Sequence, residues 1–285
     1  MSKPTFLTLP PAARAHRLVT ARGVFAVHEA GTPERGTALL VPGFTGSKED
    51  FIALLEPLAA AGYRVVAVDG RGQYESPGPR EEAAYALEEL ARDLLAQAAA
   101  LGGGPVHLVG HSLGGLVSRA AVLRDPAPFA SLTLLSSGPA AIEEAQQART
   151  KLLVAALEAL GDDMPALWAA MRAQDPPEAA GDSPELARFL RERWLATVPE
   201  QLMATSRALI SEPDRVDELA AVELPKLVLS GTVDYAWPVP LMDDMARRLG
   251  AQRVVVPDAE HSPNAENPQV TAGALSAFWN SLPGQ

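Results

Sequence analysis

Short apolar runs of strand length alternate along the chain with longer stretches in which apolar residues recur every three or four positions. The first pattern is typical of buried strands and the second of amphipathic helices. A hairpin-like stretch around His16 and His28 opens the series, and the alternation predicts an α/β fold with a mostly parallel central sheet flanked by helices. Strands are expected at 24–28, 37–41, 63–68, 106–109, 131–135, 222–231 and 253–256, the first two of them in an antiparallel arrangement, and helices at 48–61, 81–101, 113–123, 239–249 and 270–279.

One long segment interrupts this alternation. Residues 140–221 are helical in character throughout. When the opening hairpin is counted as two strands, the segment falls between the sixth and seventh strands. We therefore expect a core made of residues 1–139 and 222–285, with residues 140–221 forming a helical cap inserted between those two strands.

A glycine-flanked serine stands between one predicted strand and the helix that follows it. The sequence there is Gly110-His111-Ser112-Leu113-Gly114, with the strand at 106–109 before it. Glycines permit a turn too tight for other residues, and a G-x-S-x-G between strand and helix is typical of a nucleophile elbow. The helix N-terminus supplies unpaired N–H groups that stabilise developing negative charge. Ser112 is thus predicted to be a nucleophile.

A nucleophilic serine requires a base and an acid that orients the base. Of the five histidines, only His261 follows Ser112 in the order Ser, Asp, His that accompanies such an elbow, and it lies in a loop after a strand. Asp234 follows the strand at 222–231 and is predicted to be the acid. The main alternative is Asp258, three residues before His261. The expected catalytic triad is Ser112, Asp234 and His261.

These motifs resemble the α/β-hydrolase superfamily, and within it the esterases, monoacylglycerol lipases and thioesterases. The resemblance rests on the elbow, on the Asp234 and His261 loops, on Pro42-Gly43-Phe44 after an early strand, and on the loop that begins at Asp69. It implies an oxyanion hole formed by the backbone N–H groups of Phe44 and Leu113. The sequence departs from the family pattern at Pro42, where many members have histidine, and at Gln73-Tyr74-Glu75, where a short Gly-x-Ser is commoner.

Composition and charge narrow the class of protein further. The 285 residues carry a net charge of −11 and a hydrophobic content of 47%, which argues for a globular chain and against nucleic-acid or anionic membrane partners. The sequence contains no cysteine, so disulfides and thiol-ligated zinc are excluded, as in a reducing compartment. We also expect no signal peptide and no apolar run of membrane-spanning length. A cytoplasmic protein that needs no cofactor or metal is predicted.

Together these features predict a serine hydrolase that cleaves carboxylic esters or thioesters of small to medium acyl groups through an acyl-enzyme. Ligand pockets are mainly apolar, and we expect Phe44, Trp168, Trp194 and Met203 to contribute to substrate binding. Two alternatives stay open, because fold alone does not choose the chemistry. The same triad can serve acyl transfer, C–C bond cleavage or cofactor-free perhydrolysis and haloperoxidation, or it can survive in a non-hydrolytic ligand receptor. The oligomeric state is left open.

Overall fold

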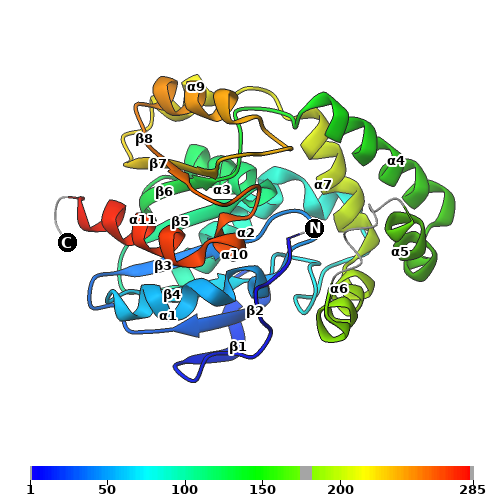
Figure 1. The fold of residues 1–285 in the computed structure, drawn as a ribbon, viewed down its shortest axis with the longest axis horizontal. Coiled ribbons are helices and arrows are strands. Elements are labelled where there is room, and N and C mark those ends of the chain that lie inside the picture. The colour runs from blue at the N-terminus through cyan, green and yellow to red at the C-terminus, as the bar shows by residue number, and fades with distance from the viewer. Residues whose placement is uncertain (1, 174–181, 283–285) are drawn as a thin grey trace.

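The computed structural model describes residues 2–173 and 182–282, and in these residues eight strands form one sheet (Figure 1). The strands are β1 (Ala13–Thr20), β2 (Gly23–Ala30), β3 (Thr37–Val41), β4 (Arg64–Val68), β5 (Val106–His111), β6 (Phe129–Leu135), β7 (Lys226–Gly231) and β8 (Gln252–Val256). The α-helices are α1 (Ile52–Ala60), α2 (Leu87–Leu101), α3 (Leu113–Arg124), α4 (Glu144–Leu160), α5 (Met164–Arg172), α6 (Pro184–Ala196), α7 (Pro199–Ser211), α8 (Val216–Ala220), α9 (Val239–Leu249), α10 (Pro263–Glu266) and α11 (Pro268–Asn280).

The strand order is β1-β2-β4-β3-β5-β6-β7-β8, and every pairing from β4 to β8 is parallel. The predicted α/β-hydrolase fold, with its mostly parallel sheet flanked by helices, is thus confirmed. The opening hairpin is also present, because β1 pairs antiparallel with β2. The two early strands run in opposite directions but do not pair with each other. Instead, β4 lies between them, antiparallel to β2 and parallel to β3.

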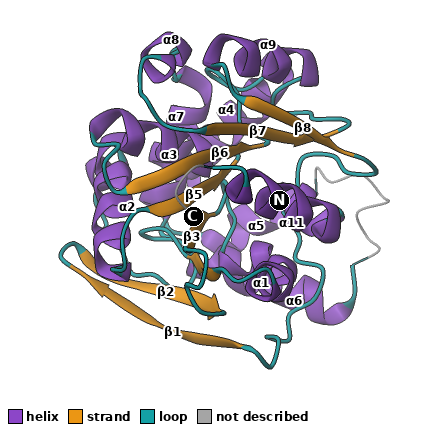
Figure 2. Cartoon of the chain, turned by 90° about the vertical axis from the view of Figure 1, so that its left-hand side faces the viewer, coloured by secondary structure: helices purple, strands orange, loops and turns teal. Residues whose placement is uncertain are grey.

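Helices cover both faces of the sheet, as Figure 2 shows. Successive residues of a strand point to opposite faces. Leu39 of β3 thus belongs to an apolar cluster with residues of α2, α3 and α9, whereas its neighbour Leu40 belongs to a second cluster with residues of α1 and α11. Strands buried on both faces read as continuous apolar runs, which is why the sequence pattern located them well. Each fully buried leucine contributes about 2 kcal/mol of hydrophobic free energy.

Two predicted helices are divided in the structure. The expected helix at 48–61 begins as a 3-10 turn, Lys48–Phe51, and continues as α1. The expected helix at 81–101 consists of a 3-10 turn, Glu82–Tyr85, followed by α2, because Ala86 adopts an extended conformation with ψ 145°. This break lets the ring of Tyr85 turn inward, where it is fully buried and its hydroxyl donates to the carbonyl of Pro79 at 2.6 Å.

The segment between β6 and β7 contributes α4, α5, α6, α7 and α8 to the described residues, and no strand of the sheet comes from that part of it. In Figure 1, α4 to α7 gather at one end of the sheet, on the side of the strand carboxyl ends. Leu157, Leu167, Trp194 and Leu202, one residue from each of α4, α5, α6 and α7, belong to a small apolar cluster of their own.

Candidate active site

The loops that carry the predicted triad all leave the sheet at one edge. Ser112 follows β5, Asp234 follows β7 and His261 follows β8, while the loop that contains Phe44 follows β3. These strands are parallel, so their carboxyl ends lie side by side. Functional groups in open α/β sheets collect at this edge for the same reason. The topology therefore brings together residues that are up to 217 positions apart, from Phe44 to His261.

Ser112 occupies a backbone conformation that favours glycine, with φ 54° and ψ −120°. Such a conformation costs about 1–3 kcal/mol and persists only when its surroundings enforce it. The neighbouring glycines provide that enforcement. A Cβ on Gly110 would lie 2.3 Å from the carbonyl oxygen of Gly114, and one on Gly114 would lie 2.4 Å from that of Val41. Hence β5, the turn and α3 approach one another closely enough to project the serine hydroxyl at the N-terminus of α3.

The three predicted triad residues form a hydrogen-bonded chain. His261 Nε2 lies 3.0 Å from Ser112 Oγ, and His261 Nδ1 lies 2.9 Å from Asp234 Oδ2. All three residues are buried. The carboxylate accepts the Nδ1 proton, which leaves Nε2 as the acceptor for the serine hydroxyl proton. This arrangement has the geometry required for general-base activation of a serine.

Backbone amides hold the acid in place. Asp234 Oδ1 accepts hydrogen bonds from the amides of Ala236 at 2.8 Å and Trp237 at 3.0 Å, so its second oxygen is directed at His261. The alternative acid, Asp258, is exposed and lies at φ 53° in the turn after β8, and the imidazole of His261 takes its hydrogen bond from Asp234. Of the two candidates, the structure brings Asp234 to the histidine.

The two predicted oxyanion donors, the amides of Phe44 and Leu113, belong to the residues that follow Gly43 and Ser112. Leu113 opens α3, and Gly43, just before Phe44, packs so closely that a Cβ on it would lie 3.0 Å from Ser112 Cβ. Throughout residues 2–173 and 182–282, no hydrogen bond is donated by either amide. Two free N–H groups beside a nucleophile are what an oxyanion requires.

The sequence predicts no role for His111, the variable residue of the elbow motif. Its Nε2 donates to the carbonyl oxygen of His261 at 2.8 Å, and its Nδ1 has no partner among the described residues. Burial removes the water that would solvate an imidazolium and lowers the pKa of His111 to about 3, with His261 adding to the effect. His111 is therefore a neutral donor that anchors the backbone of His261.

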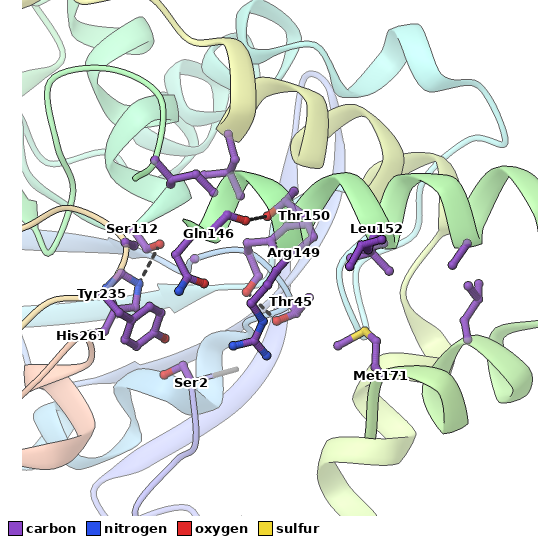
Figure 3. A pocket seen from close by; sticks show the side chains of 18 of the residues that line it. Ser2, Thr45, Ser112, Gln146, Arg149, Thr150, Leu152, Met171, Tyr235 and His261 are labelled. Carbon is purple, nitrogen blue, oxygen red and sulfur yellow. Dashed lines mark hydrogen bonds between the residues drawn. The ribbon is translucent and has the colours of Figure 1, made fainter. Parts of the chain in front are cut away.

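A cavity of about 270 Å³ opens on the serine and the histidine (Figure 3). Along α4 its lining is polar from Gln146 to Thr150, while Phe44, Ile142, Leu209 and Ala236 add apolar surface elsewhere in the wall. A second part, beyond Thr150, is apolar. This second part is formed by α4 and α5. The described residues that line it there are Leu152, Leu153, Ala156, Leu167, Ala170 and Met171.

Of the four residues predicted to contact the substrate, one lines the cavity and three lie elsewhere. Phe44 lines the cavity. Trp168, Trp194 and Met203 are not among the described lining residues and belong instead to the apolar cluster inside the α4–α7 segment. Trp194 is buried, and its indole N–H donates to the carbonyl of Met164 at 3.3 Å. Large apolar residues of this segment are thus used to hold its helices together, which helical spacing alone does not distinguish from lining a pocket.

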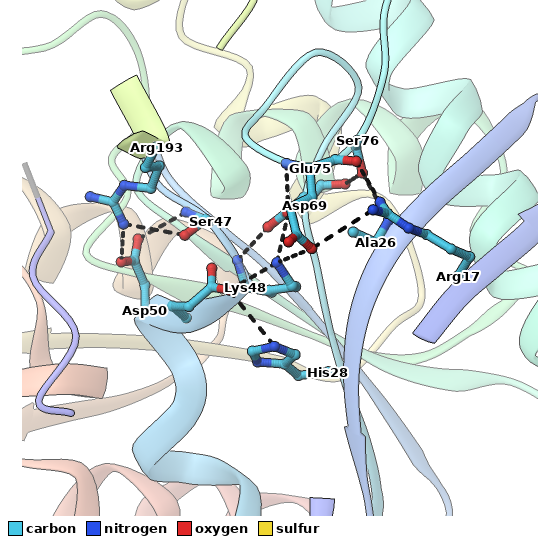
Figure 4. Close-up of polar contacts among 11 residues, drawn as sticks. Arg17, Ala26, His28, Ser47, Lys48, Asp50, Asp69, Glu75, Ser76 and Arg193 are labelled. Carbon is cyan, nitrogen blue, oxygen red and sulfur yellow. Dashed lines mark hydrogen bonds and ion pairs between the residues drawn. The ribbon is translucent and has the colours of Figure 1, made fainter. Parts of the chain in front are cut away.

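A buried ionic network lies beside the loop after β3 (Figure 4). Lys48 Nζ lies 3.0 Å from Asp69 and 2.8 Å from Glu49. From α6, the fully buried Arg193 reaches Asp50 Oδ1 at 2.7 Å and Ser47 Oγ at 3.3 Å. The network ties the turn at 47–50 both to the end of β4 and to α6.

The unusual Gln73-Tyr74-Glu75 sequence also has a structural role. Tyr74 adopts φ 42° and contacts Phe189 of α6 edge-to-face, with the two ring centroids 5.6 Å apart. Lys48 Nζ lies 4.8 Å from the centroid of the Tyr74 ring. Gln73 is buried against the loop after β3. Where the commoner pattern has a glycine and a small residue, this chain thus has larger side chains, which contact α6 and the loop of Phe44.

Two further properties bear on the class of protein. In the part of the chain that the structure describes, no helix has both the length and the apolar character needed to cross a membrane. In the same residues, no three His, Asp or Glu side chains are grouped so that they would hold a metal ion.

Known proteins similar to this chain share its architecture. Pimeloyl-(acyl-carrier protein) methyl ester esterase from Aeromonas hydrophila is 32% identical over 224 residues, 75% of this chain and 84% of that protein. 3-Oxoadipate enol-lactonase 1 from Acinetobacter baylyi is 27% identical over 255 residues, 88% of this chain and 91% of that protein. A hydrolase from Pseudomonas aeruginosa of known crystal structure superposes with a TM-score of 0.77 at 26% identity, covering 94% of this chain and 99% of that one.

The family model described as alpha/beta hydrolase fold matches residues 38–268, which include Ser112, Asp234 and His261. The match covers most of the sheet and every strand that positions a candidate catalytic group. This chain belongs to the alpha/beta hydrolase fold family.

Proposed function

We propose that this protein is a serine hydrolase that cleaves carboxylic esters or thioesters of small to medium acyl groups through an acyl-enzyme intermediate. The observation that carries the proposal is the chain of hydrogen bonds from Ser112 through His261 to Asp234, at 3.0 and 2.9 Å. Relatives named as a methyl ester esterase and an enol-lactonase support ester hydrolysis as the reaction class.

In the proposed mechanism, Ser112 Oγ attacks the ester carbonyl while His261 Nε2 takes the hydroxyl proton. Asp234 holds the imidazole in the required tautomer and stabilises the imidazolium without becoming protonated itself. His261 then gives the proton to the leaving alcohol or thiol, which departs and leaves the acyl group on Ser112. A water molecule, deprotonated by His261, attacks this acyl-enzyme and releases the acid.

The negative charge that develops on the carbonyl oxygen needs donors that are already in position. The amides of Phe44 and Leu113 are proposed as those donors, because both lie beside Ser112 and neither donates a hydrogen bond among the described residues. Removal of one such donor costs about 3–4 kcal/mol of transition-state stabilisation. The oxyanion hole is therefore expected to contribute almost as much to the rate of hydrolysis as the base does.

Residues 140–221 are proposed to act as a cap over a core made of 1–139 and 222–285. This division is supported by the position of α4 to α7 at the carboxyl edge of the sheet and by the cavity walls that α4 and α5 provide. A cavity of about 270 Å³ suits a small to medium acyl chain. Enclosure by the cap also strengthens hydrogen bonds to the oxyanion by excluding water.

Labelling with a fluorophosphonate and turnover of p-nitrophenyl esters test this proposal together. We expect one adduct, mapped by mass spectrometry to Ser112, and multiple turnovers of acetyl to octanoyl esters. Ser112→Ala is expected to abolish labelling and to lower kcat by several powers of ten. Ser211→Ala, which removes an exposed hydroxyl on α7, is the matched control.

Two results would contradict the assignment. An adduct on any serine other than Ser112 would show that the nucleophile is wrong. Binding of esters without turnover would point instead to the receptor alternative. Transfer of the acyl group to an added alcohol or to peroxide in preference to water would favour the other chemistries of the same triad.

The cytoplasmic location stays a prediction from composition.

A further inference from the structure

One cation in the cavity has no counter-charge. Arg149 lies on α4 and lines the same cavity as Ser112 and His261, and in Figure 3 its side chain extends from the helix toward Thr45 and Ser2. Among the described lining residues it is the only one with a permanent charge. No carboxylate of the described residues pairs with it. Arg149 is exposed as well as lining the cavity, so its guanidinium is open both to water and to a ligand bound beside Ser112.

The groups around Arg149 are arranged for a polar ligand. Ser2 Oγ is buried at the cavity wall and has no hydrogen-bond partner among the described residues. Gln146 lies one helical turn before Arg149 on the same face of α4, nearer to Ser112 (Figure 3). A buried hydroxyl without a partner costs free energy unless something outside the chain satisfies it.

The cavity changes character along α4. Gln146 and Ala156 are ten residues apart, about 15 Å along the helix axis. Polar and charged side chains occur on the turn nearest the serine, and apolar ones occur beyond Thr150. A molecule that fills this cavity can therefore contact Ser112, the cation on the polar turn of α4 and the apolar wall beyond Thr150.

We propose that the substrate carries a carboxylate in addition to its ester, and that Arg149, with Ser2 and Gln146, binds this carboxylate. The proposal rests on the proposed ester hydrolysis at Ser112. A single guanidinium presents two parallel N–H groups that match the two oxygens of one carboxylate. A phosphate dianion would leave its second charge uncompensated, because the described wall offers no other permanent cation.

The test compares p-nitrophenyl monoesters of dicarboxylic acids with esters of the same length that end in a neutral carboxamide. For the natural chain, we expect kcat/KM to be about fivefold higher for the carboxylate ester, the effect of one ion pair formed by an exposed arginine. This advantage should shrink as salt is added, since the pair is screened. In Arg149→Gln the ratio of the two rates should fall to about one.

The matched control is Lys151→Gln. This change removes the same charge from the same helix. Lys151 is exposed like Arg149 but is not among the described lining residues, so the ratio of kcat/KM for the two esters should equal that of the natural chain. Equal kcat/KM for the two esters in the natural chain, or an equal loss for both in Arg149→Gln, would overturn the carboxylate site and leave ester hydrolysis intact. Failure to cleave either ester would instead contradict the proposed function itself.

Discussion

The side-chain amide of Gln73 donates a hydrogen bond to the carbonyl oxygen of Gly43 at 3.0 Å. That carbonyl belongs to the same peptide unit as the N–H of Phe44, one of the two proposed oxyanion donors. Because a peptide unit is planar, fixing its oxygen also fixes the direction of its N–H. Gln73 Oε1 accepts from the amide of Gly70 at 3.0 Å, so the glutamine is itself held. Gln73 is therefore expected to be a positioning residue for the proposed oxyanion hole.

Gln73→Met should therefore impair turnover more than binding. The methionine fills a similar volume but cannot donate to Gly43. The carbonyl of Gly43 keeps the hydrogen bond from the amide of Gly46 at 3.1 Å, so the N–H of Phe44 is held less firmly. We expect kcat to fall about tenfold to a hundredfold with KM changed little, since the oxyanion exists only in the transition state. Steady-state kinetics on p-nitrophenyl esters measure this. The control, Gln97→Met, alters a buried glutamine of α2; an equal loss of kcat in both variants would contradict the role of Gln73.

The two candidate acids can be separated by amide substitutions. Asp234→Asn removes the charge that orients His261, and we expect kcat to fall by about a thousandfold or more with little change in KM. Asp258→Asn changes an exposed turn residue, and asparagine tolerates its positive φ, so less than about a tenfold effect is expected. If kinetics show the larger loss in Asp258→Asn, the acid is Asp258.

The lowered pKa of His111 links stability to pH. The folded protein excludes a proton until about pH 3, whereas the unfolded chain takes it up near pH 6.5. Stability is therefore lost as the pH falls below about 6.5, by roughly 1.4 kcal/mol per pH unit, or about 2 kcal/mol between pH 7 and pH 5. His111→Gln keeps a donor for the carbonyl of His261 but removes this titration.

Urea unfolding of both proteins at pH 7 and pH 5 isolates the effect, because every other group titrates in both. We expect the natural chain to lose about 2 kcal/mol more than His111→Gln over this range. Parallel losses in the two proteins would show that His111 is not held neutral by its burial.

The ion pair between Arg193 and Asp50 joins α6 to the turn after β3. Arg193→Met leaves the fully buried carboxylate of Asp50 without its cation, and breaking such a pair costs about 3–5 kcal/mol. The double variant Arg193→Met/Asp50→Asn removes both charges and should be more stable than either single variant. Thermal or urea unfolding gives the coupling free energy, and Arg191→Met, an exposed position on the same helix, should have almost no effect. Additive losses in the double variant would show that the pair is not coupled.

The apolar end of the cavity should set the acyl length. Each methylene buried there adds about 0.8 kcal/mol, roughly a fourfold gain in kcat/KM, until the space is full. Ala156→Phe shortens that end, so the optimum should move to shorter acyl chains while acetyl esters are cleaved as before. Ala155→Phe, an exposed position one residue away, should keep the original profile. An optimum that does not move in Ala156→Phe would place the acyl chain elsewhere.

The sequence by itself determined most strands of the sheet and pointed to Ser112, Asp234 and His261, which the structure brings within hydrogen-bonding distance of one another. The apolar strands are buried on both faces, so they occur in the sequence as continuous apolar runs. The glycines around Ser112 are required because a Cβ there would lie as close as 2.3 Å to neighbouring atoms. Asp234 and His261 were identifiable because each follows a strand whose carboxyl end must reach the same edge. Each of these features is a local sequence pattern that corresponds to one arrangement in the fold.

Only the tertiary structure decided which side chains face the cavity. Trp194 and Arg149 lie on helices. Helical periodicity shows which residues share one face of a helix, but it does not show what that face packs against. Trp194 turned out to pack within its own segment, whereas Arg149 lines the cavity beside Ser112. The contact from Gln73 to Gly43 joins two loops 30 residues apart. Such pairings depend on the relative positions of several elements, which no local pattern in the chain encodes.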